Sequence, residues 1–182
     1  MEVVLTKKYS INANKYVLNL LELVCPKGDK NNESDKNNVY VELESNKISA
    51  TNPYKARMEL HLPVKMQESY FITTLNYIGQ PEVPELYSSE NVRQALSLKN
   101  YVFDVCKVKT KKLWPNEFNE LICDGIIRID DAEFKCPTSY LEKLIESMPL
   151  FDDLLTISIE NKSLEMRFEK PCIGRYFLKN CP

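Results

Sequence analysis

The feature that most constrains the fold is a pattern that occurs twice, once near each end of the 182-residue chain. In each copy, an amphipathic helical stripe is followed by two short segments in which apolar and polar residues alternate. The alternating segments begin at Val39 and Ile48 in the first copy and at Leu155 and Leu164 in the second, so both pairs are 116 residues apart. This constant separation predicts an internal repeat whose copies fold alike.

The helical stripe of each copy has apolar residues at positions i, i+3, i+4 and i+7, which lie on one face of a helix. They are Val17, Leu20, Leu21 and Val24 in the first copy, and Leu141, Leu144, Ile145 and Met148 in the second. Pro26 ends the first helix and Pro149 the second, and Ser139 with Glu142 has the pattern of a capping box. The stripes are 124 residues apart, so the first copy has a longer loop between its helix and its hairpin.

Each alternating pair reads as a β-hairpin, because polar turn residues separate its two segments. A third alternating segment follows each hairpin, at residues 55–62 and 173–178. A shorter apolar segment precedes each helix, at residues 9–11 and 133–136. Each copy is therefore predicted to be a module of one strand, one helix and three antiparallel strands.

We predict an α+β fold in one domain, residues 1–182, with the helices of both modules on one face of an antiparallel sheet. The first module covers residues 1–63, the second covers residues 132–182, and residues 64–131 form a central elaboration. Within the elaboration, patterns predict strands at 70–75, 101–108 and 126–129 and short helices at 90–98 and 116–123.

Composition limits the function classes. Lys and Arg total 24 against 26 Asp and Glu, a formal net charge of -2, so a surface that is basic all over is excluded. The sequence has neither a long apolar stretch for a membrane span nor the pattern of a signal peptide, which predicts a cytoplasmic protein without membrane contact. The 6 cysteines are scattered and His61 is the only histidine, so reduced thiols and no metal site are expected.

Three segments resemble the repeating module of DNA sliding clamps. Residues 134–145 resemble the strand that enters a clamp helix, and residues 154–168 resemble the hairpin that follows. Residues 43–52 resemble the corresponding hairpin of the bacterial clamp, with its alanine-threonine pair. The resemblance extends over the two end modules, about half of the chain. Clamps contain two or three such domains per chain, whereas this chain has room for one, and the central elaboration has no counterpart in them.

The resemblance implies a non-catalytic accessory of DNA replication, a processivity factor that binds DNA, a polymerase or another replication protein, and that forms homo-oligomers. It also implies that Lys15 and Lys143, on the polar faces of the two helices, contact DNA. Glutamates lie beside both lysines, so the helix faces are nearly neutral, and phosphate binding requires positive charge. The alternative is a clamp-like module that binds protein alone and regulates or inhibits a larger complex.

A basic and aromatic cluster in the elaboration is the second candidate site for nucleic acid. Its lysines are Lys107, Lys109, Lys111 and Lys112, and the nearby aromatic residues are Tyr101, Phe103 and Trp114. Alternation places Lys107, Lys109 and Lys111 on one side of a strand, where they can hold phosphates while rings stack on bases. The alternative interpretation is a solvated strand edge that lysines protect from aggregation.

No catalytic pattern is evident, and no cofactor or small-molecule substrate is expected. The chain has only 4 glycines and no phosphate-binding loop, and its adjacent acidic pairs have no third ligand at metal-like spacing. Cys136 precedes a predicted helix, whose dipole lowers the pKa of a nearby thiol. Without a histidine base close in sequence, a buried structural thiol is the favoured interpretation, and a small cysteine enzyme is the less favoured one.

Overall fold

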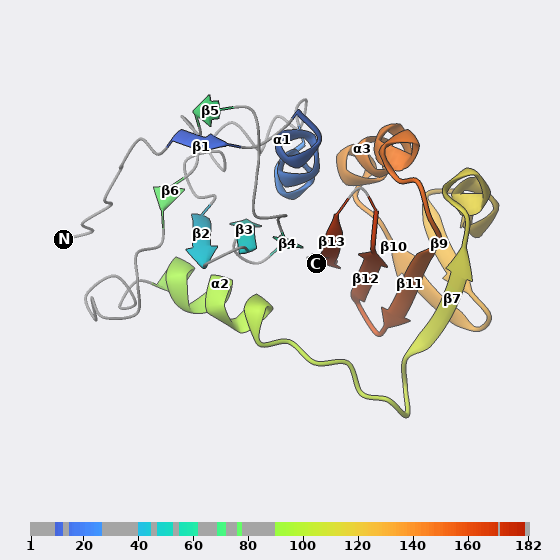
Figure 1. Ribbon diagram of the computed structural model, residues 1–182. Helices are drawn as coiled ribbons and strands as arrows, with labels where there is room; N and C mark the ends of the chain where they lie inside the picture. The colour runs from blue at the N-terminus through green and yellow to red at the C-terminus, as the bar shows by residue number, and fades with distance from the viewer. Residues whose placement is uncertain are drawn as a thin grey trace.

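In the computed structural model, the described chain is built around one eight-stranded sheet with helices on both of its faces (Figure 1), an α+β architecture. The structure describes residues 10–12, 15–26, 40–44, 47–52, 55–61, 69–71, 76–77, 90–170 and 172–180. The strand order of this sheet is β6-β2-β3-β4-β13-β12-β11-β7. No helix in the described segments is long and apolar enough to cross a membrane.

The same succession of elements occurs in both halves of the chain, as the repeat predicts. Helix α1 (Lys15–Leu21) and helix α3 (Thr138–Ser147) each continue into a short 3-10 turn, η1 (Glu22–Val24) and η5 (Met148–Leu150). Three antiparallel strands follow each helix. They are β2 (Tyr40–Glu44), β3 (Lys47–Asn52) and β4 (Ala56–His61) in the first half, and β11 (Leu155–Glu160), β12 (Ser163–Phe168) and β13 (Ile173–Lys179) in the second.

Strands β4 and β13 join the two halves. They pair antiparallel, with Met58 opposite Tyr176 and Leu60 opposite Gly174. Because of this pairing the two three-stranded units form one continuous sheet, and α1 and α3 lie over the same face of it (Figure 1). The helices of both halves therefore share one layer, which we call the helix face; the opposite side of the sheet is called the outer face.

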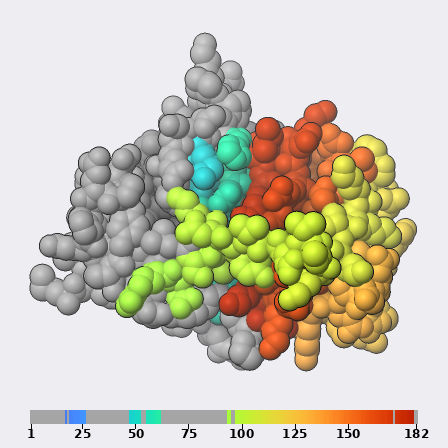
Figure 2. All heavy atoms as spheres, turned by 90° about the horizontal axis from the view of Figure 1, so that it is seen from below, coloured from blue at the N-terminus to red at the C-terminus, as the bar shows by residue number. Residues whose placement is uncertain are grey.

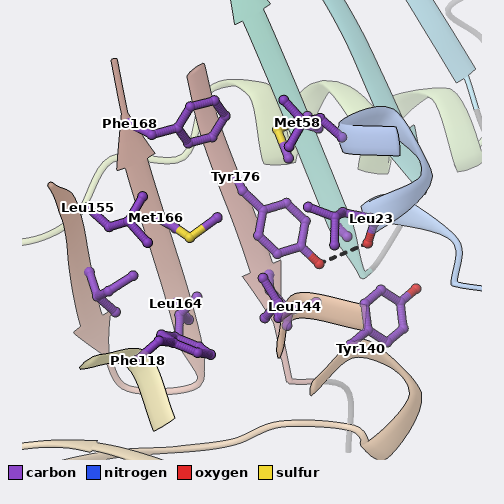
Figure 3. Packing of buried hydrophobic residues seen from close by; sticks show 14 of the residues in the cluster. Leu23, Met58, Phe118, Tyr140, Leu144, Leu155, Leu164, Met166, Phe168 and Tyr176 are labelled. Atoms are coloured by element: carbon purple, nitrogen blue, oxygen red, sulfur yellow. Dashed lines mark hydrogen bonds between the residues drawn. The ribbon is translucent and has the colours of Figure 1, made fainter. Parts of the chain in front are cut away.

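The hydrophobic core lies between the sheet and the helix face and draws on both halves (Figure 3). Met58, Leu164 and Tyr176 of the sheet lie in the same core as Leu144 of α3 and Leu23 of η1, and all five are essentially without solvent exposure. Alternation produces this arrangement, since every second residue of a strand points to the same side. The apolar residues of both repeats therefore belong to one core.

Buried polar groups also connect the halves at the end of η1. The Tyr176 hydroxyl donates to the Leu23 carbonyl at 2.9 Å, which Figure 3 marks with a dashed line. The Tyr140 hydroxyl donates to the Val24 carbonyl at 3.0 Å, and Asn52 Nδ2 donates to that carbonyl at 3.1 Å. The last carbonyls of a helix have no partners within it, so these side chains satisfy acceptors that would otherwise be buried unpaired.

The central elaboration differs most from prediction. Helix α2 (Glu90–Lys99) is close to the predicted range, and it lies on the outer face (Figure 1). The strand predicted at 101–108 is wrong: residues 100–108, here called the strap, have no regular structure, and strand β7 (Lys109–Leu113) follows them. The predicted helix at 116–123 is a 3-10 helix, η4 (Pro115–Leu121).

Smaller sheets complete the fold. Strands β8 (Ile122–Cys123), β9 (Ile126–Ile129) and β10 (Ala132–Lys135) form a three-stranded sheet. Strand β1 (Ser10–Asn12) pairs with β5 (Ser69–Phe71), and β6 (Asn76–Tyr77) pairs parallel to β2. The strands that enter the helices, β1 and β10, therefore lie outside the main sheet. Parts of the predicted segments at 9–11 and 70–75, together with Val39, lie outside the described residues.

The predicted capping box at Ser139 and Glu142 is wrong. Helix α3 begins at Thr138, and its N-cap residue is Pro137, which forms no side-chain capping hydrogen bond. Ser139 is therefore inside the first turn rather than at the capping position. Proline suits this boundary because its fixed φ and missing N–H cost nothing there.

Candidate functional site

The lysines of β7 lie at the edge of the main sheet and are divided between its two faces. Lys109 and Lys111 are opposite Ile159 and Ile157 of β11, whereas Lys112 is opposite Thr156. Cross-strand partners share a face, so Lys109 and Lys111 are on the helix face and Lys112 is on the outer face. Lys107 lies in a turn before the strand. The predicted single row of Lys107, Lys109 and Lys111 is therefore wrong, because the strand begins two residues later than that row requires.

Two of these four lysines are engaged in ion pairs. Lys109 Nζ lies 3.4 Å from Asp131 Oδ1, and Lys107 Nζ lies 3.7 Å from Asp104 Oδ2. Lys111 and Lys112 are exposed and have no ion pair to another described residue. The position of β7 as an edge strand fits the alternative interpretation, in which lysines discourage pairing with another sheet.

The helix face carries little positive charge. Lys143 of α3 reaches across to η1, where its Nζ lies 3.8 Å from Glu22 Oε2. Glu142 and Glu146 are exposed on α3. Lys15 is the first residue of α1, and its side chain lies outside the described part. The described side chains therefore do not form the basic surface that contact between these helices and DNA requires.

The strap crosses the outer face of the second half, where Figure 2 shows it as a yellow-green band over the red strands. Aromatic packing holds its first part: the Tyr101 and Phe103 ring centroids lie 4.8 Å and 6.0 Å from that of Phe177 on β13. The Asp104 amide donates to Glu160 Oε2 at 2.9 Å, and Glu160 is buried. The strap is therefore attached to the sheet by rings at one end and by a buried carboxylate further along.

An open pocket of about 590 Å³ lies between the strap and strands β7, β11, β12 and β13. Strap residues Tyr101, Phe103 and Val108 supply apolar lining. Hydroxyls supply part of the opposite side, where Thr110 Oγ1 and Ser158 Oγ are hydrogen-bonded at 2.9 Å. A pocket with apolar walls and a few polar groups is the ordinary form of a binding site.

Charged residues line one side of this pocket. The buried Glu165 carboxylate accepts hydrogen bonds from Arg167 Nε and from Arg175 Nε, both at 2.5 Å. Arg175 also donates from Nη2 to the Tyr101 carbonyl at 3.1 Å, and its guanidinium lies 5.7 Å from the Phe177 ring centroid. One carboxylate thus orients both arginines, and Arg175 is also fixed by the Tyr101 carbonyl and the Phe177 ring.

The sequence pattern does not predict this pocket. Arg167, Arg175 and Glu165 occupy alternating polar positions of the predicted strands, a pattern that equally describes a solvated sheet face. One signal for the pocket is present in the sequence. The apolar residues Val102 and Val105 lie beside Tyr101 and Phe103, in a segment whose pattern predicts a strand. Only the crossing of the strap over the sheet brings these groups together.

The Cys136 thiol has the surroundings of a buried structural group rather than of a reactive one. Cys136 is 6% exposed, and burial raises the pKa of its thiol to about 12, whereas a helix dipole alone would lower that pKa. His61 is exposed at the end of β4, as the alternation predicts. Among the described residues, no group of three or more His, Cys, Asp or Glu side chains is arranged to hold a metal ion.

Comparison with known proteins gives no family for the chain. No protein-family model matches the sequence. No curated protein matches it either.

Proposed function

We propose that this chain is a non-catalytic accessory of DNA replication, built on a sliding-clamp-like domain, that acts by binding a polymerase or another replication protein. The observation that carries the proposal is the β4–β13 pairing, which makes one sheet from two helix and three-strand units and places α1 and α3 on the same face. Paired modules with a shared helix layer are the arrangement that the resemblance implies.

Charge favours protein binding over DNA encirclement. On the helix face, Lys143 is engaged by Glu22, and Glu142 and Glu146 add negative charge. Non-specific DNA affinity comes largely from phosphate neutralisation, which such a face does not supply. On the outer face, the pocket beneath the strap combines apolar walls with arginines, a composition typical of protein-binding sites.

Two measurements test this proposal together. The first is fluorescence anisotropy of a labelled DNA duplex, titrated with the full chain at about 50 mM and about 200 mM salt, where phosphate contacts produce a steep loss of affinity. We expect weak binding at both concentrations. The second is primer extension by the DNA polymerase of the organism that encodes the chain, where adding the chain is expected to change the product lengths. Unchanged product lengths would contradict the replication role.

A second candidate function is DNA binding at the edge of the sheet. Its support is that Lys111 and Lys112 are exposed and lack ion pairs to other described residues. Under this candidate, the same titration shows a steep salt dependence, and Lys111→Gln with Lys112→Gln removes it. Lys162→Gln, an exposed lysine in the turn between β11 and β12, is the matched control. Native mass spectrometry of the same samples reports the homo-oligomers that a ring requires.

A further inference from the structure

Three exposed apolar residues lie at one end of the main sheet. They are Trp114, Leu154 and Ile173, here called the end row, and their side chains are 50%, 41% and 60% exposed. Among the described residues, the other exposed large hydrophobic side chains are Val102 and Val105 on the strap. The end row does not line the pocket beneath the strap. It is therefore a separate apolar surface.

The strand register brings Trp114 and Leu154 together. Leu113 of β7 is opposite Leu155 of β11, so the next residues at this end of the strand pair are Trp114 and Leu154. Leu113 and Leu155 are buried in the core beneath the helix face. Trp114 keeps an extended conformation, with φ -74° and ψ 150°, which directs its side chain to the outer face. Alternation places Leu154 on the same face.

Ile173 extends the row to β13. It is the first residue of that strand and lies two positions before Arg175, which reaches the strap, so both side chains are on the outer face. Strands β7, β11, β12 and β13 are consecutive in the sheet, and the row therefore crosses three strand spacings, roughly 15 Å. An extended segment of five residues is roughly 17 Å long, so one segment of a partner can cover the row.

Carboxylates lie beside the two apolar residues at the edge of the sheet. Glu117 Oε2 accepts a hydrogen bond from the Trp114 amide at 2.8 Å. Asp153 Oδ1 accepts one from the Leu154 amide, also at 2.8 Å. No described cation forms an ion pair with either carboxylate. Both negative charges are therefore available to a partner.

The negative charge continues toward Ile173. Phe168 at the end of β12 is opposite Gly174 of β13, so the next residue, Glu169, comes beside Ile173, and Glu169 is exposed. Two exposed cations adjoin the row, Lys112 and Lys170. They are outnumbered by the carboxylates of Glu117, Asp152, Asp153 and Glu169. Charge complementarity thus favours an occupant that carries positive charge next to apolar groups.

The same charge argues against a nucleic acid at the end row. An exposed tryptophan ring can stack on a base. The phosphates of a bound strand, however, would lie beside Glu117 and Asp153. Nucleic-acid affinity depends on neutralising phosphates, which these carboxylates oppose.

We propose that the end row is the docking surface for a segment of a partner protein in which apolar residues alternate with lysine or arginine. The apolar side chains of the segment cover Trp114, Leu154 and Ile173, and its cations bind the carboxylates beside them. Tryptophan is enriched among the residues that dominate binding energy, so Trp114 is the central contact. This inference rests on the proposed role in protein binding and adds to it the place and the chemistry of the contact.

The emission of Trp114 provides the test, because it is the only tryptophan of the chain. The full chain is titrated with three ten-residue peptides that lack tryptophan. The first has leucines separated by arginines; in the second, serines replace the leucines, and in the third, glutamates replace the arginines. We expect the first peptide to shift the emission to shorter wavelength and to bind at least about tenfold more tightly than either of the others.

Variants locate the binding. Leu154→Ser with Ile173→Ser is expected to weaken the first peptide about tenfold, because the apolar contact is lost. Glu117→Gln with Asp153→Asn is expected to weaken it severalfold. These amide side chains still offer an oxygen to the two backbone N–H groups, so only the charge is removed.

Matched controls carry the same kinds of substitution elsewhere on the surface. Val102→Ser with Val105→Ser replaces exposed apolar residues of the strap, and Glu142→Gln with Glu146→Gln removes exposed charges from α3. Both controls should bind the first peptide as the original chain does. Thermal unfolding followed by circular dichroism confirms that each variant is folded.

The results separate this inference from the proposed function. Absence of an emission shift, equal binding of the serine or glutamate peptide, equal weakening by the controls, or displacement of the peptide by a single-stranded oligonucleotide would each overturn the docking surface. If the chain still changes polymerase product lengths in that case, the proposed function stands and only the docking surface falls. If the peptide binds as expected and product lengths are unchanged, the docking surface stands and the replication role falls.

Discussion

Tyr176 illustrates how one side chain can serve two parts of this fold. Its ring packs in the core of the second half, and its hydroxyl donates to the Leu23 carbonyl at the end of η1 in the first half. Burial raises the pKa of Tyr176 well above its usual range, so the hydroxyl remains protonated and able to donate. A polar contact of this kind favours one alignment of the halves, because a shift would leave a buried acceptor unpaired.

Replacing Tyr176 by Phe is therefore expected to lower the free energy of unfolding by about 1–2 kcal/mol, since the ring is kept and the Leu23 carbonyl loses its donor. Urea unfolding followed by circular dichroism measures the change. Tyr101→Phe is the control, because no hydrogen bond of its hydroxyl to a described residue is present and its ring packing is retained. Equal losses in both variants would show that the Tyr176 hydroxyl contributes nothing particular.

The role of a lysine depends on neighbours that are not near it in sequence. A lysine in sequence can hold a phosphate, form an ion pair or protect a strand edge, and composition alone does not separate these roles. Lys109 and Lys143 have carboxylates beside them, from Asp131 and Glu22, that are distant in sequence. No spacing rule predicts such partners, because the contacts depend on how the elements pack.

At the scale of elements, β13 is the strand on which the assembly depends, since it pairs with β12 on one side and with β4 on the other. Gly174 permits a close approach within it. A Cβ placed on Gly174 would lie 2.2 Å from Cζ of Phe168 and 3.0 Å from Cδ2 of Leu60. The absence of a side chain here makes room for the Phe168 ring in the core.

Gly174→Ala is expected to lower the free energy of unfolding by about 1–3 kcal/mol, because the added methyl overpacks the core against Phe168. Ile173→Ala on the same strand is the control, and it should change stability by less than about 0.5 kcal/mol because Ile173 is largely exposed.

A double-mutant cycle with Phe168→Leu tests the cause, since a smaller side chain at 168 relieves the clash. The double variant should be more stable than the sum of the two single losses predicts. Strict additivity would contradict steric conflict between these two positions.

Helices and strands follow the sequence pattern where its periodicity is strong and depart from it where the periodicity is weak. The helices near 14–24 and 141–148 and both hairpins were predicted because their apolar spacing is regular. The strap was predicted as a strand because Tyr, Val and Phe have high β propensity. Tertiary packing overrides the β propensity of the strap. The strap lies across the face of a sheet whose strands are already paired, so it is held by the packing of its aromatic rings and not by strand pairing.

At the scale of the whole molecule, the core contains residues of both halves, and β4–β13 pairing makes the sheet continuous. Each three-stranded unit is small for independent stability, and a shared core compensates for that. The two halves are therefore expected to unfold together rather than in sequence.

Met58→Ala tests this cooperativity. Met58 is fully buried on β4 in the first half, and its truncation is expected to cost about 2–5 kcal/mol. The single tryptophan, Trp114, lies in the second half of the sheet at the end of β7, so its fluorescence reports on that half. Fluorescence and far-ultraviolet circular dichroism should show one coincident transition, shifted equally in the variant. Two separated transitions would show that the halves are independent.

The α+β class, the two recurring units and their hairpins can be predicted from the amino-acid sequence, because periods of 2 and 3.6 residues are local properties of the chain. Three features cannot be predicted from it: β4 pairs with β13, the strap crosses the outer face, and Arg175 donates a hydrogen bond to the Tyr101 carbonyl. These outcomes depend on contacts between residues far apart in sequence. Such contacts form only when surfaces from distant parts of the chain are buried together. A local pattern of apolar residues therefore does not predict them.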